Sequence, residues 1–301
     1  VAGRGIQRLR DAGVVVDLPP APLTSPPIDS LPAGARLIDR YEIEGIEQLG
    51  RNVLCYRARD HLLERTVNLR VPRENEQDRT RRGALRRQAR IHATLRHPNI
   101  VQAFDYFEDP KLGVCAMVEE YTGGRTLEAW LRERQAPSQP YATARHFLLP
   151  LASAMAYAHR YGVVHRNLKP AKIALDRSDD PKITDFAQLA TATPAAGIVG
   201  TLEYMPPEQI DNPRLSDPTA DIYAMGVVFY EIVSGHLPLQ GANDLELAAK
   251  LINEAPRPLV DWGVELPTGL DAIVLRCLEK NPAHRYPSAD ALHLALRDVL
   301  A

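Results

Sequence analysis

The chain has 301 residues, of which 45% are hydrophobic and 25% charged, and its formal net charge is −2. This length and hydrophobic content are typical of a globular protein with one large domain or two ordinary ones. Because the net charge is small and no uncharged apolar run reaches about eighteen residues, we expect neither a nucleic-acid partner nor a membrane span in this chain.

The first 36 residues differ in pattern from the rest. Residues 1–17 contain a short helical spacing of apolar residues and a run of three valines, which together are too little for a domain. Their run Val-Ala-Gly-Arg-Gly-Ile-x-Arg-Leu-Arg-x-Ala-Gly-Val resembles the end of a riboflavin-biosynthesis-type deaminase domain; the alternative is a tail that packs on the neighbouring domain. Residues 18–36 hold six prolines, so we predict a semi-rigid linker between an upstream domain of the same protein and residues 37–301.

Residues 37–301 change from a strand pattern to a helix pattern. Residues 37–70 alternate apolar and polar side chains around glycines, which predicts hairpins, and a basic helical stretch follows. Later apolar residues recur at helical spacing in three stripes: Leu148, Leu151, Met155 and Ala158; Leu270, Ile273, Val274, Cys277 and Leu278; and Leu292, Leu296, Val299 and Leu300. This order predicts an α+β fold with two lobes, a small β-rich N-lobe over residues 37–121 and a larger helical C-lobe over residues 122–301.

One short run is the most informative part of the sequence. Residues 165–172 read His-Arg-Asn-Leu-Lys-Pro-Ala-Lys, which matches the protein-kinase catalytic loop H-R-D-L-K-P-x-N except at two positions. Further kinase motifs follow in family order: His97 to Val101, Thr184 to Ala187 for D-F-G, Pro206 to Glu208 for A-P-E, Asp221 to Gly226, and Arg285 as the partner of Glu208. Over residues 37–301 the chain resembles the eukaryotic-like bacterial serine/threonine protein kinases, which implies their two-lobed fold.

The departures from the family pattern lie where phosphotransfer occurs. Asn167 replaces the aspartate that accepts the substrate's hydroxyl proton, and a carboxamide cannot be a general base near neutral pH. Lys172 replaces the asparagine that binds magnesium, and an ammonium repels a divalent cation. The resemblance puts Arg70 at the phosphate-binding lysine and Gln88 at the glutamate that pairs with it, so their contact becomes at best a hydrogen bond. The glycine-rich loop retains one glycine, Gly50.

These departures lead us to interpret the chain as a pseudokinase, a catalytically impaired kinase-like domain that acts as a regulatory or protein-binding module of a larger protein. No catalytic residue is intact in this interpretation, although Lys169 is retained. One alternative is an active or weakly active bacterial Ser/Thr protein kinase that binds ATP and uses Asp185 and Lys169. A second alternative is a regulatory or scaffold domain fused to a deaminase-like enzyme.

The resemblance also outlines a weak nucleotide pocket. Its candidate residues are Gly50, Arg70, Gln88, Glu120, Lys172 and Asp185, with Asp185 also the metal candidate. The implied cofactor is ATP, with or without magnesium. Two hypotheses stay open: an ion pair between Arg70 and Glu119 partly fills the pocket, or Arg70 and Lys172 supply positive charge in place of magnesium. Glu119 turned to solvent is the alternative to the ion pair.

Seven arginines mark a possible contact surface. They lie on the predicted helix before His97 and on its approach: Arg79, Arg81, Arg82, Arg86, Arg87, Arg90 and Arg96. A solvated helical face is the default interpretation of such a run. The alternative is a protein partner whose acidic groups dock there.

The three cysteines indicate the redox compartment. They are odd in number, far apart and without C-x-x-C spacing, which argues against a disulfide framework or a zinc site. We therefore expect Cys55, Cys115 and Cys277 to be small core residues in a reducing, cytoplasmic compartment.

Overall fold

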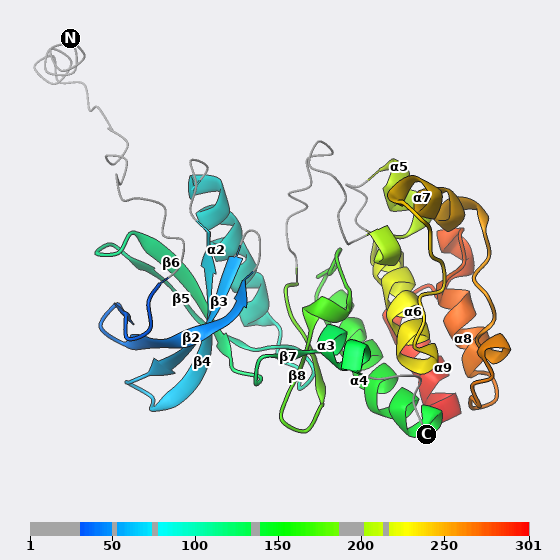
Figure 1. The fold of residues 1–301 in the computed structure, drawn as a ribbon, viewed down its shortest axis with the longest axis horizontal. Helices are drawn as coiled ribbons and strands as arrows, with labels where there is room; N and C mark the ends of the chain where they lie inside the picture. The colour runs from blue at the N-terminus through cyan, green and yellow to red at the C-terminus, as the bar shows by residue number, and fades with distance from the viewer. Residues whose placement is uncertain are drawn as a thin grey trace, which may run out of the picture.

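The computed structural model describes residues 31–49, 53–73, 78–133, 139–186, 202–212 and 217–300. They form two lobes joined by the segment that follows Glu120 (Figure 1). A β-sheet and one helix build the first lobe, and the second lobe consists mainly of helices, so the predicted α+β fold is confirmed. The predicted upstream remnant, residues 1–17, lies outside the described residues.

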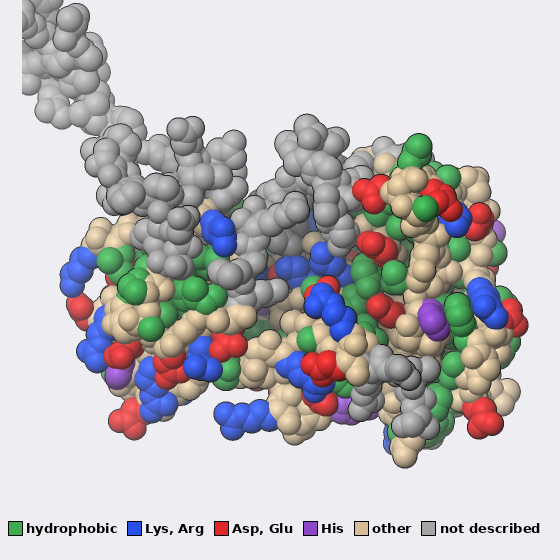
Figure 2. All heavy atoms as spheres, viewed as in Figure 1, with side chains coloured by type: hydrophobic (Ala, Val, Ile, Leu, Met, Phe, Trp, Pro, Cys, Tyr) green, Lys and Arg blue, Asp and Glu red, His purple; other side chains and the backbone are tan. Residues whose placement is uncertain are grey.

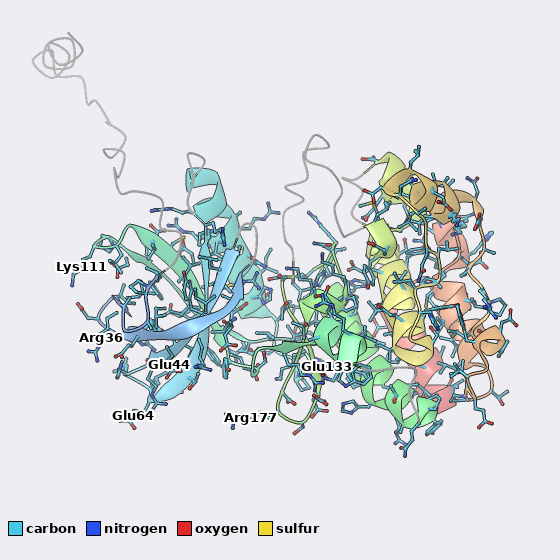
Figure 3. The ribbon with its side chains drawn as sticks, in the orientation of Figure 1. Arg36, Glu44, Glu64, Lys111, Glu133 and Arg177 are labelled. Carbon is cyan, nitrogen blue, oxygen red and sulfur yellow. The ribbon has the colours of Figure 1, made fainter. Side chains whose placement is uncertain are left out.

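A six-stranded antiparallel sheet forms the N-lobe, in the order β1-β2-β3-β4-β6-β5. Its strands are β1 (Arg36–Leu37), β2 (Tyr41–Leu49), β3 (Val53–Asp60), β4 (Arg65–Pro72), β5 (Ala103–Asp109) and β6 (Val114–Glu120). Successive side chains of a strand point to opposite faces, which lets Tyr41, Tyr56 and Leu69 pack in one apolar cluster. At the outer rim, Arg36 and Lys111 project into solvent (Figure 3). The hairpins predicted over residues 37–70 are confirmed.

The folded part of the chain begins earlier than the predicted boundary at residue 37. Leu31 is buried, and its backbone N–H donates to the hydroxyl of Tyr56 at 2.9 Å. The N–H of Gly34 donates to the carbonyl of Ile43 at 2.8 Å. The last six residues of the predicted linker therefore pack on the sheet, because one leucine in a proline-rich segment supplies an apolar anchor that composition alone does not reveal.

Helix α2 (Asp78–Thr94) covers one face of β5 and β6. Its Leu85 and Ala89 are buried against Ala103, Cys115 and Met117 of these strands. This packing fixes the helix on the sheet and places the buried Gln88 beside the space between the lobes, where it reaches Asp185 of the C-lobe.

The C-lobe is built around helix α6. Its helices are α3 (Leu127–Glu133), α4 (Pro140–Arg160), α5 (Pro207–Asp211), α6 (Pro218–Ser234), α7 (Asp244–Asn253), α8 (Leu270–Cys277) and α9 (Ala289–Leu300). Strands β7 (Arg125–Thr126), β8 (Ile173–Leu175) and β9 (Pro181–Ile183) form a small sheet next to the N-lobe. Helix α6 is apolar on nearly all sides, and α4, α8 and α9 pack against it, which makes it the centre of the lobe (Figure 1).

Two glycines shape this lobe. Gly162, with φ of +70°, follows the end of α4 as predicted, and its N–H donates to the backbone carbonyl of His159. At Gly226 a Cβ would lie 2.6 Å from the Cβ of Cys277, so only glycine lets α6 approach α8 this closely. The residues of the first predicted stripe are all buried within α4, which confirms that prediction.

The three cysteines are buried and form no disulfide among the described residues, as expected for core residues. In the part of the chain that the structure describes, no helix combines the length and the apolar character needed to cross a membrane. Acidic and basic side chains are interspersed over both lobes on the face drawn in Figure 2.

Candidate active site

The loop that follows α4 is held in place by Asp221. This carboxylate, in the first turn of α6, is 1% exposed and accepts hydrogen bonds from the backbone N–H groups of His165 at 2.7 Å and Arg166 at 2.8 Å. The Nε2 atom of His159 lies 2.8 Å from the same carboxylate. These bonds hold Arg166 at φ of +71°, a backbone conformation that costs a non-glycine residue about 1–3 kcal/mol. Asp221 therefore has a structural role, because it fixes the backbone of this loop.

His165 connects this loop to the segment before Asp185. Its Nε2 atom donates to the carbonyl of Thr184 at 2.8 Å, and its Nδ1 atom accepts from the N–H of Asn167 at 3.3 Å. Burial lowers the pKa of His165, which keeps the ring neutral and able to accept at Nδ1. His165 therefore positions other residues and does not act on substrate.

Asn167 and Lys169 stand on this fixed loop. Asn167 is partly buried, and its side chain is a carboxamide that can orient a hydroxyl group but has no lone pair that titrates near neutral pH. Burial and then the charge of Lys172 lower the pKa of Lys169, so the two ammonium groups lie in one electrostatic environment. The loop thus presents a neutral amide, Asn167, where the family pattern has a carboxylate base, and an ammonium, Lys172, where it has a metal ligand.

Asp185 is the centre of a buried ion cluster, which we define as Arg70, Lys172, Asp185 and Gln88. The carboxylate is 1% exposed and forms ion pairs with Arg70 Nη1 and Lys172 Nζ. Burial opposes its ionisation, but the charges of Arg70 and Lys172 prevail and hold its pKa well below the usual range. Asp185 is therefore ionised and already neutralised by two cations at neutral pH.

Gln88 lies in this cluster, although its partner differs from the predicted one. Its Nε2 atom donates to Asp185 Oδ1 across 3.4 Å, so the amide contacts the acid that also binds Arg70. The guanidinium of Arg70 is itself bound to Asp185, because a carboxylate is a stronger acceptor for it than an amide oxygen. With glutamine at residue 88, the side chains of Gln88 and Arg70 both contact the same acid, Asp185.

Glu119 faces the cluster from β6. It is 1% exposed, its Oε2 atom is 3.9 Å from Arg70 Nε and accepts a 3.4 Å hydrogen bond from Asn68, and its Oε1 atom has no partner among the described residues. The hypothesis of an Arg70 to Glu119 ion pair is therefore supported only as a long contact, since Asp185 is the closer acid. Burial outweighs the nearby arginine and raises the pKa of Glu119 to about 7.

This raised pKa predicts a pH-dependent stability. The ordinary pKa of this carboxyl is 4.5, so between pH 4.5 and about 7 the folded protein binds more protons at Glu119 than the unfolded chain. The contribution of Glu119 is complete below pH 4.5 and is lost as the pH rises through about 7, a decrease of roughly 3 kcal/mol at most.

The variant E119Q isolates this effect. We expect its midpoint of thermal unfolding to fall less than that of the wild type when the pH is raised across the same window. Glu231→Gln changes a partly buried glutamate outside the cleft whose pKa burial also raises, and its unfolding midpoint over the same pH window serves as the comparison. Parallel curves for wild type and E119Q would show that Glu119 does not take up a proton on folding.

Glu120 and Gly50 complete the set of candidate residues. The side chain of Glu120 forms an ion pair with Lys182 Nζ of β9 at 2.9 Å and lies 3.4 Å from the backbone nitrogen of Gln102. It links the lobes and does not point its carboxylate at the ion cluster. Gly50 lies outside the described residues.

Magnesium, the metal that the family pattern implies, does not fit this site. Among the described residues, no group of three or more His, Cys, Asp or Glu side chains is placed to hold a metal ion. Both oxygens of Asp185 already have partners, Arg70 and Gln88 on Oδ1 and Lys172 on Oδ2. Magnesium binds through carboxylates and substrate phosphates, so here it would have to displace two cations.

The space available to a nucleotide is small in this arrangement. The cavity beside the ion cluster has a volume of about 70 Å³ and is lined by Cys55, Asn68, Arg70, Glu119, Glu120 and Asp185, among others. Pockets that hold small molecules usually have roughly 300 Å³ or more. A nucleotide therefore requires the lobes to move apart or the side chains of Arg70 and Glu119 to rearrange.

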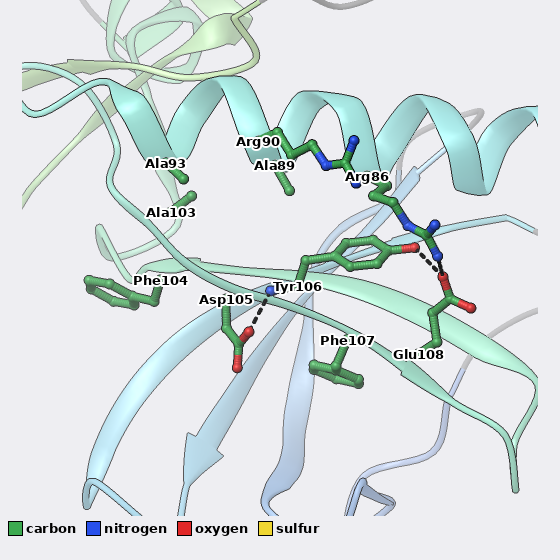
Figure 4. A pocket seen from close by; sticks show the side chains of 10 residues that line it. All are labelled: Arg86, Ala89, Arg90, Ala93, Ala103, Phe104, Asp105, Tyr106, Phe107 and Glu108. Atoms are coloured by element: carbon green, nitrogen blue, oxygen red, sulfur yellow. Dashed lines mark hydrogen bonds and ion pairs between the residues drawn. The ribbon is translucent and has the colours of Figure 1, made fainter.

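The predicted basic helix is only partly a free surface. Arg82 bonds to the carbonyl of Gly113, and Arg86 pairs with Glu108 beside the ring of Tyr106 (Figure 4). Between α2 and β5 lies a groove of about 470 Å³. Its lining combines three alanines, three aromatic rings and four charged side chains: Ala89, Ala93, Ala103, Phe104, Tyr106, Phe107, Arg86, Arg90, Asp105 and Glu108. The side chains of residues 79 and 81 are outside the described set. The protein partner at this face stays a prediction.

Comparison with known proteins agrees with this architecture. The family model "Protein kinase domain" matches residues 46–295. The chain is 31% identical to the serine/threonine-protein kinase PrkC of Bacillus subtilis, over 88% of this chain and 41% of that protein. It is 32% identical to the serine/threonine-protein kinase PknB of Mycobacterium leprae, over 89% and 43% respectively. The chain thus spans about two fifths of the length of these relatives.

This comparison overturns the interpretation of the chain as a pseudokinase that serves as a regulatory module. The matched relatives are named as serine/threonine protein kinases, and the similarity runs through both lobes. The alternative of an active or weakly active kinase fits these findings better. The interpretation is wrong because it weighs a few substituted residues in the cleft above the similarity of the rest of the chain.

Proposed function

Because the chain belongs to the protein kinase family, we propose that it transfers the γ-phosphoryl group of ATP to a serine or threonine hydroxyl of a protein substrate. The observation that carries this proposal is the fixed geometry of the loop at residues 165–169. Asp221 and His165 set its backbone through buried hydrogen bonds, so Asn167 and Lys169 occupy defined positions in the cleft.

The chemistry of the reaction is compatible with the missing base. Phosphoryl transfer passes through a loose transition state in most analyses, and the enzyme contributes mainly by positioning the reactants and stabilising charge. Cations suited to that task are Lys169, Lys172 and Arg70. A general base typically adds about 10²–10⁴ in rate, so we expect turnover lower by roughly this factor than in a kinase with an aspartate at residue 167.

In this proposal Asn167 orients the acceptor hydroxyl by a hydrogen bond to its carboxamide oxygen. The hydroxyl proton leaves to solvent or to the phosphoryl oxygens, since no side chain at residue 167 can take it. Lys169 stabilises negative charge on the transferred group. The substrate's identity is left to experiment, because the described surface supplies no motif for one.

Transfer of radiolabelled phosphate from ATP to a serine- and threonine-containing protein tests the proposal. We expect slow labelling that Lys169→Met abolishes and that Lys250→Met, a matched change at a partly exposed lysine of α7 paired with Glu246, leaves unchanged. Labelling that persists in Lys169→Met, or no labelling above the protein-free blank, would overturn the proposed function.

A further inference from the structure

The backbone around Lys172 fixes its side chain beside Asp185. The carbonyl of residue 172 accepts hydrogen bonds from the N–H of Thr184 at 2.9 Å and from its hydroxyl at 3.2 Å. The N–H of residue 172 donates to the carbonyl of Lys169 at 2.8 Å. These hydrogen bonds fix the backbone of Lys172, and from this position its ammonium forms an ion pair with Asp185.

Arg70 approaches the same carboxylate from the other lobe. It stands on β4, its side chain is 7% exposed, and its guanidinium contacts Asp185. One acid and two bases leave an excess of one positive charge among these three side chains, and Glu119, 3.9 Å from Arg70 Nε and with its pKa raised by burial to about 7, offsets this excess only in part near neutral pH. Lys172 is the more accessible of the two cations, with 22% of its side chain exposed, so it is the one that can turn to a ligand in the cleft.

This charge balance is the reverse of a magnesium site. A magnesium site gathers acidic oxygens that leave room for a cation, whereas here the cations are part of the protein and both oxygens of Asp185, the acid that they share, already have partners. An arrangement with surplus positive charge favours an anion, and guanidinium and ammonium groups bind phosphate oxygens through charge-assisted hydrogen bonds.

We propose that this site binds the phosphates of ATP through Lys172 and Arg70 and without magnesium. The inference rests on the proposed use of ATP as phosphoryl donor. The ammonium of Lys172 replaces the divalent ion as the group that neutralises phosphate charge, and it does so from the position where the family pattern has a metal-binding asparagine. ATP binding therefore survives removal of divalent metal.

Titration of the wild-type chain with ATP, followed by calorimetry and by thermal unfolding, tests this in two buffers, one with EDTA and one with magnesium. We expect equal or tighter binding in EDTA. Binding that disappears in EDTA and returns with magnesium would overturn the inference while leaving the proposed function intact. Absence of ATP binding in both buffers would overturn both.

Two substitutions at residue 172 sharpen the result. Lys172→Met removes the charge and should weaken ATP binding in EDTA by tenfold or more. Lys172→Asn removes the charge and adds an amide oxygen that can bind a metal, so its ATP binding should become dependent on magnesium. Lys111→Met, at an exposed lysine paired with Asp39, is the matched control and should bind like the wild type.

The unliganded midpoint of unfolding of each variant shows whether it folds. If Lys172→Met folds and binds ATP in EDTA as tightly as the wild type, Lys172 does not neutralise the phosphates and the inference fails. If Lys172→Met does not fold, Lys172→Asn decides, because its amide can still hydrogen-bond to Asp185 and keep the site together.

Discussion

The substitution Asn167→Asp should raise the rate of phosphotransfer by roughly 10²–10⁴-fold. The change replaces an amide nitrogen by an oxygen of nearly the same size, on a loop whose backbone is already fixed by Asp221 and His165. The new group can accept the proton that the wild-type carboxamide cannot.

Steady-state turnover with a peptide acceptor measures this prediction. The rate of the variant should also rise with pH through the pKa of the new aspartate, near 4 in an unperturbed setting, whereas the wild type lacks that acid limb. Asn253→Asp, the same chemical change at the exposed end of α7, should leave the rate unaltered. An Asn167→Asp variant that binds ATP normally and turns over no faster would contradict the role assigned to residue 167.

The second large effect concerns stability. Arg285 is 1% exposed, and its guanidinium forms two parallel hydrogen bonds of 2.7 Å with the carboxylate of Glu208. It also donates to the backbone carbonyls of Glu279, Lys280 and Thr219. Removing one partner of such a pair leaves a charge and several acceptors unsatisfied, so Arg285→Met should lower the free energy of unfolding by about 3–5 kcal/mol.

Denaturant unfolding measures this loss in the free energy of unfolding. A double variant separates the effect of the missing arginine from that of the unpaired carboxylate. In Arg285→Met with Glu208→Gln the stranded carboxylate is gone, so part of the lost stability should return. Arg276→Met, at an exposed arginine of α8 that lies over the ring of Tyr286, should cost less than about 1 kcal/mol. A loss below about 1 kcal/mol for Arg285→Met itself would show that the pair does not stabilise the lobe.

The structural framework of the C-lobe could be predicted from the sequence. Glu208 and Arg285 are 77 positions apart, yet their motifs identify them as partners, and the structure places them in contact. This pair could be predicted because the family resemblance assigns the two positions to each other. The bonds from Asp221 to the backbone of His165 and Arg166 were not predicted, because the motifs do not specify a backbone contact.

The partners within the cleft could not be predicted in the same way. Arg70 can reach two acids, Asp185 and Glu119, and one amide, Gln88. Its partner depends on which of these contacts costs the least free energy of desolvation. Asp185 takes Arg70, Lys172 and Gln88 together, which leaves Glu119 with a long contact and a raised pKa. The sequence supplies the competing groups, but only the packed geometry decides among them.

The position of Asp185 has a further consequence for ligand affinity. Its carboxylate contacts the guanidinium and the ammonium that a phosphate group would contact under our proposal, and so acts as an internal competitor for them. A phosphate group would have to displace this carboxylate, so only the difference between the free energies of the two contacts would contribute to the dissociation constant. We therefore expect the protein's own acid to lower its affinity for phosphate.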